Sequence, residues 1–202
     1  MKRIEDENRI VFFTSSKFKF EEASRIAQNF GLDMIRKSEN IIEIQSESLE
    51  EIALFKARQL MKRYRNLTFV VEDDGIFIEA LNGFPGPYSS YVYRTIGNSG
   101  ILKLMKGEVN RGALFKSVVV LHVPNMGLKS FTGICKGTIA KSIHHGRMFG
   151  YDPIFKPLKA DKCFSEMTPE EKNLFSHRAK SFKKVFSFLI KIRSTINGED
   201  YG

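Results

Sequence analysis

The chain alternates between short apolar runs and stretches in which apolar residues recur at helical spacing. Short apolar runs are typical of buried strands, and two longer runs joined by a turn are typical of a hairpin. The predicted strands are residues 10–13, 41–44, 67–71, 114–123 and 130–140. Strands that alternate with helices favour an α/β fold, and the hairpin makes the predicted sheet mixed, with helices packed against it.

Capping residues mark the boundaries of the predicted helices. The first helix follows residues 14–16 and ends at Gly31, because glycine readily adopts the left-handed conformation that closes a helix. Ser48 and Glu51 have the spacing of a capping box for a helix that runs to about residue 65. Another helix is expected over residues 99–106. The segment 168–171 combines a capping box with a proline, and a break near residue 176 separates this helix from a closing amphipathic one.

Length, charge and cysteine content limit the class of protein. A chain of 202 residues suits one domain, residues 1–202, with a sizeable core. The formal net charge of +9 favours an anionic partner, although basic residues can also serve solubility alone. Cys135 and Cys163 are far apart, which fits a reduced intracellular protein. The sequence has no signal peptide and no apolar stretch of membrane-spanning length, so we expect a cytoplasmic protein with no membrane partner.

The first candidate site lies where the first strand meets the first helix. Its residues are Thr14, Ser15, Ser16, Lys17, Phe18 and Lys19. A helix N-terminus presents unpaired backbone N–H groups, and the hydroxyls and lysines add donors and charge for a polyphosphate. The glycines of a Walker A loop are absent. The alternative is a serine N-cap beside solvated lysines.

The second candidate site is the acidic run Glu72-Asp73-Asp74, which follows the third predicted strand. Adjacent carboxylates repel one another, so they need a cation or full solvation. Their oxygens suit a Mg²⁺ ion that also holds a substrate phosphate. Because successive strand residues point to opposite faces, we expect that not all three carboxylates contact one ion. The alternative is an acidic turn exposed to solvent.

Two later segments combine side chains that suit a nucleotide. The first comprises Phe149, Gly150, Tyr151 and Asp152, and the second contains Lys172, His177 and Arg178. Aromatic rings beside a carboxylate can form a pocket for a base, and a basic group between two helices can bind phosphate or a base edge. The alternatives are an aromatic core segment closed by a proline turn and a structural histidine beside solvated charges.

Together the four segments resemble the inosine triphosphate pyrophosphatase family, which hydrolyses nonstandard purine nucleoside triphosphates. The family's motifs occur here in the same order: Thr14 with Lys19, Glu43-Ile44-Gln45, Glu72-Asp73 before Gly75, Pro85 to Ser89, Phe149 to Pro153, and Glu171 to Arg178. Each motif alone is weak, but six in order across residues 10–186 are specific.

The resemblance implies a fold, a reaction and an assembly. The fold is an elongated mixed α/β structure with two lobes and the nucleotide in the cleft between them. The reaction is hydrolysis between the α and β phosphates of ITP, XTP and their deoxy forms, which gives a monophosphate and pyrophosphate. The cofactor is Mg²⁺, and the usual assembly is a homodimer.

The resemblance also assigns the metal and the catalytic base. Glu43 and Asp73 would hold Mg²⁺, with Glu72 as a further ligand, so that the ion neutralises phosphate charge and positions a water. Asp73 would also be the general base for that water. Asp74 stands where the family often has Ser or Thr, so we expect it to contact the substrate.

Other residues would bind the substrate. Lys19 and Lys172, with the backbone N–H groups of residues 14–19, would hold the triphosphate and stabilise the leaving pyrophosphate. Phe149, with Gly150 and Tyr151 beside it, would stack on the purine. The hydrogen-bonding edge of the base would face Asp152, His177 and Arg178. Donors at this edge would favour a 6-oxo purine, because the amine of adenine leaves them unpaired.

Two departures from the family pattern leave the base preference open. Ser15-Ser16 stands where the family usually has Gly-Asn, and Arg147-Met148 replaces a glycine-rich segment. A pyrophosphatase for pyrimidine or ordinary nucleotides is therefore a close alternative. A basic nucleic-acid-binding module is a more distant one, because the carboxylates at 72–74 would repel a phosphate backbone. We expect no specific nucleic-acid partner.

Overall fold

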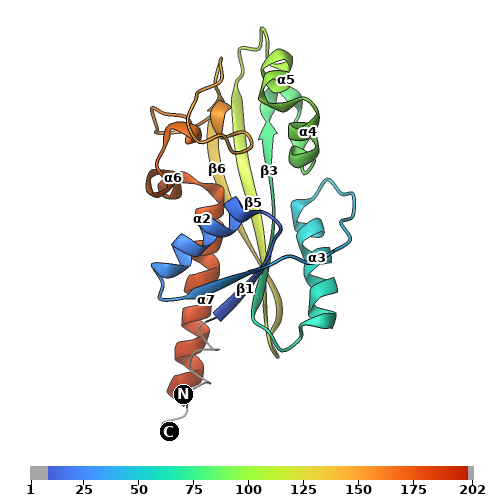
Figure 1. Ribbon diagram of the computed structural model, residues 1–202, viewed down its shortest axis with the longest axis vertical. Helices are drawn as coiled ribbons and strands as arrows, with labels where there is room; N and C mark the ends of the chain where they lie inside the picture. The colour runs from blue at the N-terminus through green and yellow to red at the C-terminus, as the bar shows by residue number, and fades with distance from the viewer. Residues whose placement is uncertain (1–8, 200–202) are drawn as a thin grey trace.

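Seven strands form one mixed sheet in residues 9–199, the part of the chain that the computed structural model describes (Figure 1). The strands are β1 (Arg9–Phe13), β2 (Asp33–Lys37), β3 (Phe69–Ile78), β4 (Pro85–Gly86), β5 (Gly112–Val123), β6 (Gly127–Ile139) and β7 (Phe155–Pro157). Their order is β2-β1-β3-β5-β6-β7, and β4 pairs with β3. β1 is parallel to β2 and β3, whereas the other pairs are antiparallel. The predicted mixed sheet is confirmed.

Helices cover both faces of this sheet. They are α2 (Lys17–Gln28), α3 (Leu49–Arg63), α4 (Ser89–Thr95), α5 (Gly97–Leu104), α6 (Pro169–Phe175) and α7 (His177–Glu199). Helices α2 and α7 lie on one side of the lower lobe and α3 on the other, while α4 and α5 belong to the upper lobe (Figure 1). Short 3-10 helices occur at Glu79–Leu81, Asp152–Ile154 and Phe164–Glu166. None of the helices within residues 9–199 has the length and apolar character needed to cross a membrane.

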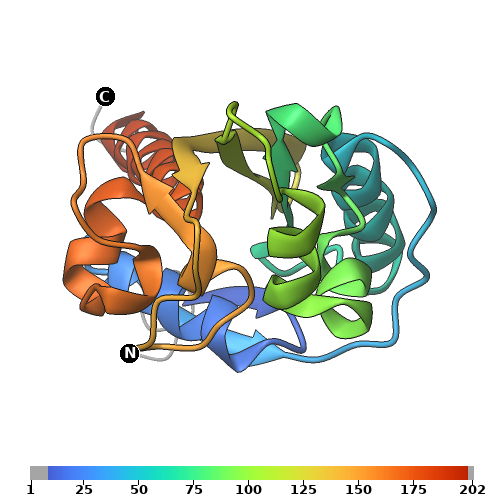
Figure 2. The same cartoon turned by 90° about the horizontal axis from the view of Figure 1, so that it is seen from above.

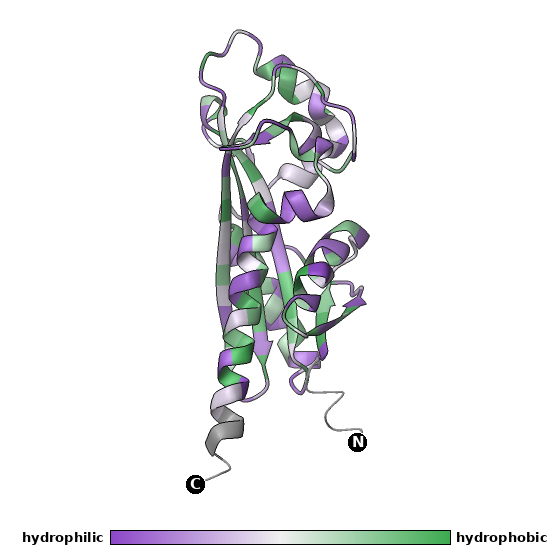
Figure 3. Ribbon diagram, turned by 90° about the vertical axis from the view of Figure 1, so that its left-hand side faces the viewer, coloured by the Kyte–Doolittle hydropathy of each residue, from purple (hydrophilic) through white to green (hydrophobic). Residues whose placement is uncertain are grey.

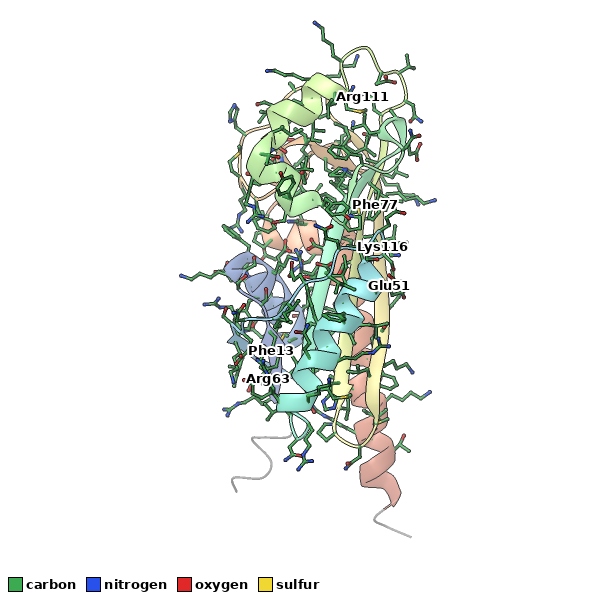
Figure 4. All side chains as sticks on the ribbon, turned by 90° about the vertical axis from the view of Figure 1, so that its right-hand side faces the viewer. Phe13, Glu51, Arg63, Phe77, Arg111 and Lys116 are labelled. Carbon is green, nitrogen blue, oxygen red and sulfur yellow. The ribbon has the colours of Figure 1, made fainter. Side chains whose placement is uncertain are left out.

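Alternation along the central strands produces two cores in the lower lobe. Ile10 and Phe12 of β1 pack with α2 and α7, whereas Phe13 packs with α3 on the opposite face (Figure 4). In β3, Val70 faces α7 and Val71 faces α3 in the same way. Full burial of each such side chain contributes about 1.5–3 kcal/mol relative to exposure. The period of two therefore decides which helix each strand residue contacts.

A third core stabilises the upper lobe, which the long strands β3, β5 and β6 also enter. It contains Ile76, Phe115, Phe155 and Phe164, with ring centroids 4.7 Å apart for Phe115 and Phe155. At its upper end Arg111 donates from Nε to the Ile139 carbonyl at 2.6 Å and from Nη1 and Nη2 to two further carbonyls (Figure 4). One sheet thus connects the two lobes, and the elongated form implied by the resemblance is confirmed.

The predicted amphipathic helix at the C-terminus is confirmed. Its apolar residues Phe182, Val185, Phe186 and Leu189 are buried against the sheet, and hydrophobic and hydrophilic residues alternate along α7 in Figure 3. The helix approaches β6 closely at Gly133, where an added Cβ would lie 2.0 Å from the His177 carbonyl oxygen. A glycine is therefore required where the first turn of α7 crosses the sheet.

The capping predictions are confirmed with one difference. Thr168 and Glu171 make both bonds of a capping box, and α6 ends at Ser176 as predicted. Ser48 accepts from the Glu51 N–H, but the Glu51 carboxylate accepts a bond from Ser46 instead of returning to the Ser48 backbone. Ser46 Oγ accepts the Ser48 N–H, so the Ser46 hydroxyl takes the place of the direct bond from the Ser48 N–H to the Glu51 carboxylate.

Three predicted elements are wrong in position. Residues 41–44 are not a strand: β2 is Asp33–Lys37, and the later segment is a loop whose Ile42 donates its N–H to Gln59 Oε1 and accepts from Gln59 Nε2 through its carbonyl. β3 does not end at the acidic run but continues to Ile78, because β5 pairs with it throughout. The helix expected at 99–106 is α5, which begins at Gly97, and a separate helix, α4, precedes it.

Candidate active site

The acidic run lies in the middle of β3, so its side chains point alternately to the two faces of the sheet. Glu72 and Asp74 face α2 and α7, where both contact Arg178. Asp73 faces α3, where it contacts Lys56. The expectation that the three carboxylates do not share one ion is therefore supported by the strand geometry. A solvent-exposed turn is excluded, since Glu72 is buried and the other two are only partly exposed.

Asp73 and Glu43 converge on the ammonium group of Lys56. Lys56 Nζ lies 3.2 Å from Asp73 Oδ1 and 2.6 Å from Glu43 Oε1. Burial raises the pKa of Asp73 to about 6, although Lys56 and Lys19 oppose the rise. Two carboxylates from separate segments thus both contact one positively charged group, the Lys56 ammonium. Sequence reasoning missed Lys56; its place eight residues into the helix that follows the Glu43 loop was the available signal.

Glu72, predicted as a further metal ligand, has Arg178 and Ser117 as its nearest partners. Its side chain is fully buried, and both carboxylate oxygens lie 2.9 Å from Arg178 Nε. Ser117 Oγ donates a further bond to Glu72 Oε1 at 2.7 Å. These partners lie on the face of the sheet opposite Asp73, so Glu72 and Asp73 do not converge on one position. It holds Arg178 in place.

Asp74 lies among three basic or polar side chains. It forms an ion pair with Lys19, accepts from Arg178 Nη2 at 2.8 Å, and lies 3.5 Å from His177 Nε2. Burial opposes its ionisation, but Lys19 and Arg178 outweigh that effect and hold the pKa of Asp74 well below its usual range. Asp74 is therefore an ionised carboxylate between Lys19 and the basic side chains at the start of α7.

A second buried ion cluster surrounds Lys172. Its Nζ lies 2.6 Å from both Glu22 Oε1 and Asp152 Oδ2. Glu22 also pairs with Arg178, and these two cations outweigh burial and lower the pKa of Glu22 to about 2. The same two carboxylates raise the pKa of Lys172 despite its burial. Glu22 was not predicted, and its position one turn after Lys19 on α2 was the only signal.

His177 is buried, and one of its nitrogens is unpaired. Its ring stacks on Phe115 with centroids 4.6 Å apart and an interplanar angle of 8°. Nδ1 is buried without a hydrogen-bond partner among the described residues. Burial lowers the pKa of His177, so the neutral ring predominates. A buried polar atom of this kind requires a partner, and a bound ligand can provide one.

The segment 149–152 contributes side chains with unequal roles. The Phe149 ring lies 5.6 Å from Lys172 Nζ and 4.8 Å, centroid to centroid, from the ring of Phe18. Tyr151 is buried and donates to the Ser89 carbonyl at 2.8 Å, which is a structural contact. Gly150, with φ of +52°, turns the chain between them and accepts from Asn98 through its carbonyl.

The start of α2 provides the predicted helix N-terminus. Ser16 is the N-cap and its Oγ accepts the Lys19 N–H at 3.3 Å, while Thr14 Oγ1 accepts the Ser16 N–H. These residues, Ser15 and Lys19 line the cavity described below. Lys17 and Phe18 do not line it, and both side chains are exposed. Phe18 instead packs against Phe149 with 55% of its surface exposed.

A cavity of about 510 Å³ is lined by most of these groups. It is lined by Ser89 and Tyr93 of α4 and by residues 148–152, and in Figure 2 the green helix α4 and the orange segment that contains residues 148–152 lie on different sides of the upper lobe. Fifteen of the seventeen residues predicted for the site line it; the exceptions are Lys17 and Phe18. Its size falls in the range of about 300–1,000 Å³ that is usual for small-molecule sites.

Comparisons with known proteins agree with this arrangement. A dITP/XTP pyrophosphatase of Pyrococcus horikoshii is 44% identical over 181 residues, which cover 90% of this chain and 96% of the relative. One of Methanopyrus kandleri is 46% identical over 176 residues, covering 87% and 93%.

Solved structures are similar as well. The Ham1 protein of Staphylococcus aureus superimposes with a TM-score of 0.77 at 27% identity and covers 91% of this chain and 98% of its own. A dITP/XTP pyrophosphatase of Mycobacterium abscessus gives a TM-score of 0.68 at 29% identity, with 88% and 98% covered. The sequence model of the Ham1 family matches residues 10–188, and the chain belongs to this family.

Proposed function

We propose that this protein hydrolyses dITP, ITP and XTP to the nucleoside monophosphate and pyrophosphate. The observation that carries the proposal is the division of one cavity by β3. Asp73 faces Glu43 and Lys56, whereas Asp74 faces Lys19 and Arg178. The reacting carboxylate, Asp73, is thereby kept apart from buried charges, such as Arg178, that can form hydrogen bonds with a base. The names of the relatives give the substrate class.

The residues on the Asp73 side suit attack by water on a phosphorus atom. Asp73 takes a proton from water, whose oxygen bonds to the α-phosphorus while the bond to the bridging oxygen breaks and pyrophosphate leaves. A pKa near 6 lets this carboxylate act as a general base at neutral pH. Lys56 on this side binds the phosphates together with Lys19 and the N–H groups at the start of α2, which reach the same cavity from the Asp74 side, and these groups stabilise charge on the leaving group.

The residues at Glu43 and Asp73 fit a Mg²⁺ ion. Their oxygens both come within 3.2 Å of one ammonium nitrogen, so two hard ligands from different segments converge on a cationic position. Mg²⁺ bound there with a substrate phosphate would neutralise charge and lower the pKa of a bound water. Glu72 is not part of this proposal, because Arg178 and Ser117 occupy it.

The opposite wall suits a purine base. Phe149 offers a ring face next to Lys172, and His177 offers a buried nitrogen without a partner among the described residues. Arg178 and Lys172 are held as permanent donors by buried carboxylates. Donors fixed in this way favour the 6-oxo group of hypoxanthine or xanthine over the amine of adenine.

A panel of nucleotides tests the proposal. Release of pyrophosphate from ITP, dITP, XTP, ATP and GTP is measured with Mg²⁺ and again with a chelator. We expect rapid release from the first three with Mg²⁺ and much slower release from ATP and GTP. Equal rates on every purine would remove the specificity claim. No release from any nucleotide, together with salt-sensitive binding of DNA or RNA, would favour the nucleic-acid-binding alternative.

We further propose a cytoplasmic homodimer. Phe84, Tyr88 and Tyr91 expose 41%, 43% and 63% of their surface within one short segment of the upper lobe, which is consistent with a protein contact there. Both cysteines are free, as expected in a reducing compartment. Light scattering should give about twice the chain mass of 23.1 kDa. A mass equal to one chain at micromolar concentration would overturn the dimer.

A further inference from the structure

A group of side chains outside the cavity brings three potential metal-binding atoms together. These belong to His144, Cys163 and Glu166, and their donor atoms all lie within 4.8 Å of one another. None of the three lines the cavity. His144 comes from the segment that leads to Phe149, whereas Cys163 is the N-cap and Glu166 the last residue of the 3-10 helix that precedes α6. We propose that these residues form a Zn²⁺ site.

The donor atoms are of the kind that Zn²⁺ prefers. A thiolate and an imidazole select Zn²⁺ over Mg²⁺ or Ca²⁺, and a carboxylate is a common third ligand. His144 Nδ1 lies 3.2 Å from Glu166 Oε2. Ligand bonds of about 2.0–2.3 Å at tetrahedral angles place neighbouring donors roughly 3.3–3.8 Å apart, so small side-chain rotations suffice. Three protein ligands leave a fourth position for water.

The backbone already fixes the segments that carry these donors. His144 N donates to the Pro153 carbonyl at 2.9 Å, and the His144 carbonyl accepts from Ser165 Oγ at 2.8 Å. Arg147 N donates to the Ser165 carbonyl at 2.8 Å. The two segments are thus connected before any ion binds, and little conformational entropy is lost on binding.

Charge and access are also suitable. The side chains of His144 and Glu166 are 39% and 35% exposed, so an ion can enter from solvent, while Cys163 is buried beneath them. A thiolate and a carboxylate together balance the two charges of Zn²⁺. Glu166 Oε2 also accepts the Cys163 N–H at 2.7 Å, and this bond orients the carboxylate as an outer-shell partner would.

The site would connect two walls of the cavity. Residues 144–149 carry His144 at one end and Phe149 at the other, and the segment from Cys163 to Lys172 leads into the ion cluster. Zn²⁺ would therefore restrain the position of the base-stacking ring relative to Lys172. This role is structural and does not depend on the proposed hydrolysis.

Cobalt spectroscopy on the full-length chain tests the site. Co²⁺ replaces Zn²⁺ and gives a near-ultraviolet charge-transfer band only when a thiolate binds it. Excess Mg²⁺ is included so that Glu43 and Asp73 are not available to Co²⁺. We expect a band that saturates at one equivalent, that Zn²⁺ abolishes, and that is lost in Cys163→Ser. Cys135→Ser is the matched control and should retain the band, because Cys135 is a buried cysteine elsewhere in the core.

A second pair of variants makes the test independent of Cys163→Ser folding. His144→Ala should weaken Co²⁺ and Zn²⁺ binding at least 10-fold, whereas His145→Ala, at the exposed neighbouring position, should bind as the parent does. Circular dichroism verifies that each variant is folded. The absence of a charge-transfer band in the parent protein, or equal affinity of the His144→Ala and His145→Ala variants, would overturn the proposal.

Discussion

Arg178 Nε lies 2.9 Å from both carboxylate oxygens of Glu72, although the two residues are 106 positions apart in the chain. The side chains are 1% and 0% exposed. This pair joins the first turn of α7 to the centre of β3, and it orients the guanidinium so that Nη1 reaches Glu22 and Nη2 reaches Asp74. One buried carboxylate thus positions the cation that the site presents to its ligand.

Removing one member of this pair should destabilise the fold. Arg178→Met leaves buried Glu72 with Lys19, at 3.8 Å, as its remaining cation, and loss of the closer partner costs up to about 3–5 kcal/mol of unfolding free energy. The double variant Arg178→Met with Glu72→Gln should recover part of this loss, because the uncompensated charge is gone. Urea unfolding without nucleotide measures both. A double variant that is no more stable than Arg178→Met would contradict the coupling.

Asp73→Asn should abolish turnover and preserve the fold. An amide cannot take the proton from water, so kcat should fall by about 10²–10⁴-fold. Lys56 keeps Glu43 as a partner, so the loop stays attached to α3. Pyrophosphate release from ITP and circular dichroism provide the two measurements. The control Asp33→Asn, at an exposed position on β2, should have normal turnover, and unchanged turnover in Asp73→Asn would remove this residue from the mechanism.

Glu43→Gln should change the metal requirement. The loop residue supplies one of the two carboxylates at the proposed Mg²⁺ position, so the Mg²⁺ concentration for half-maximal activity should rise about 10-fold or more. Glu47→Gln on the same exposed loop is the matched control. An identical Mg²⁺ dependence for both variants would show that Glu43 is not a ligand.

The pH dependence of the unfolding free energy should show how much the ion pairs of Glu22 stabilise the fold. Its pKa in the folded protein is about 2, below the ordinary value of 4.5. A lowered pKa contributes stability above pH 4.5, and this contribution is lost as pH falls toward 2. The unfolding free energy of the parent should therefore exceed that of Glu22→Gln by at most about 3 kcal/mol at neutral pH, and the gap should narrow on acidification.

The exposed neighbour Glu21 provides the control for that measurement. Glu21→Gln should follow the parent curve over the whole pH range. A gap between the parent and Glu22→Gln that stays constant from pH 5 to pH 2 would contradict the ion pairs of Glu22 with Lys172 and Arg178.

Gly133→Ala should weaken the packing of α7 on β6. The added Cβ would lie 2.0 Å from the His177 carbonyl oxygen and 2.5 Å from the Ser181 nitrogen, and both atoms belong to helix backbone. Overpacking of this kind costs about 1–3 kcal/mol or more. Thermal unfolding measures the loss, and the adjacent Thr132→Ala should change stability less. Equal melting temperatures for the two variants would show that α7 can shift away from β6 without loss of stability, which would contradict the prediction.

The local sequence pattern predicted correctly those features that depend on a single helix. The capping box at Thr168, the break at Ser176 and the apolar stripe of α7 are all present as predicted. The pattern failed at β2, because an edge strand with few buried side chains carries a weak apolar signal, whereas Ile41 to Ile44 is an apolar loop held by Gln59. It also ended β3 too early, since pairing with β5 carries charged residues through the sheet.

The sequence alone determined the family motifs and the mixed α/β class, and nearly all of the residues that it predicted for the site line the cavity. The tertiary structure decided what each acidic residue does. Strand alternation placed Asp73 toward Lys56 and sent Glu72 and Asp74 toward Arg178, and these partners come from helices distant in the chain. Glu22 and Lys56 gained roles only in this way. A carboxylate's partners depend on which face of the sheet it occupies, and its burial and pairing set its pKa.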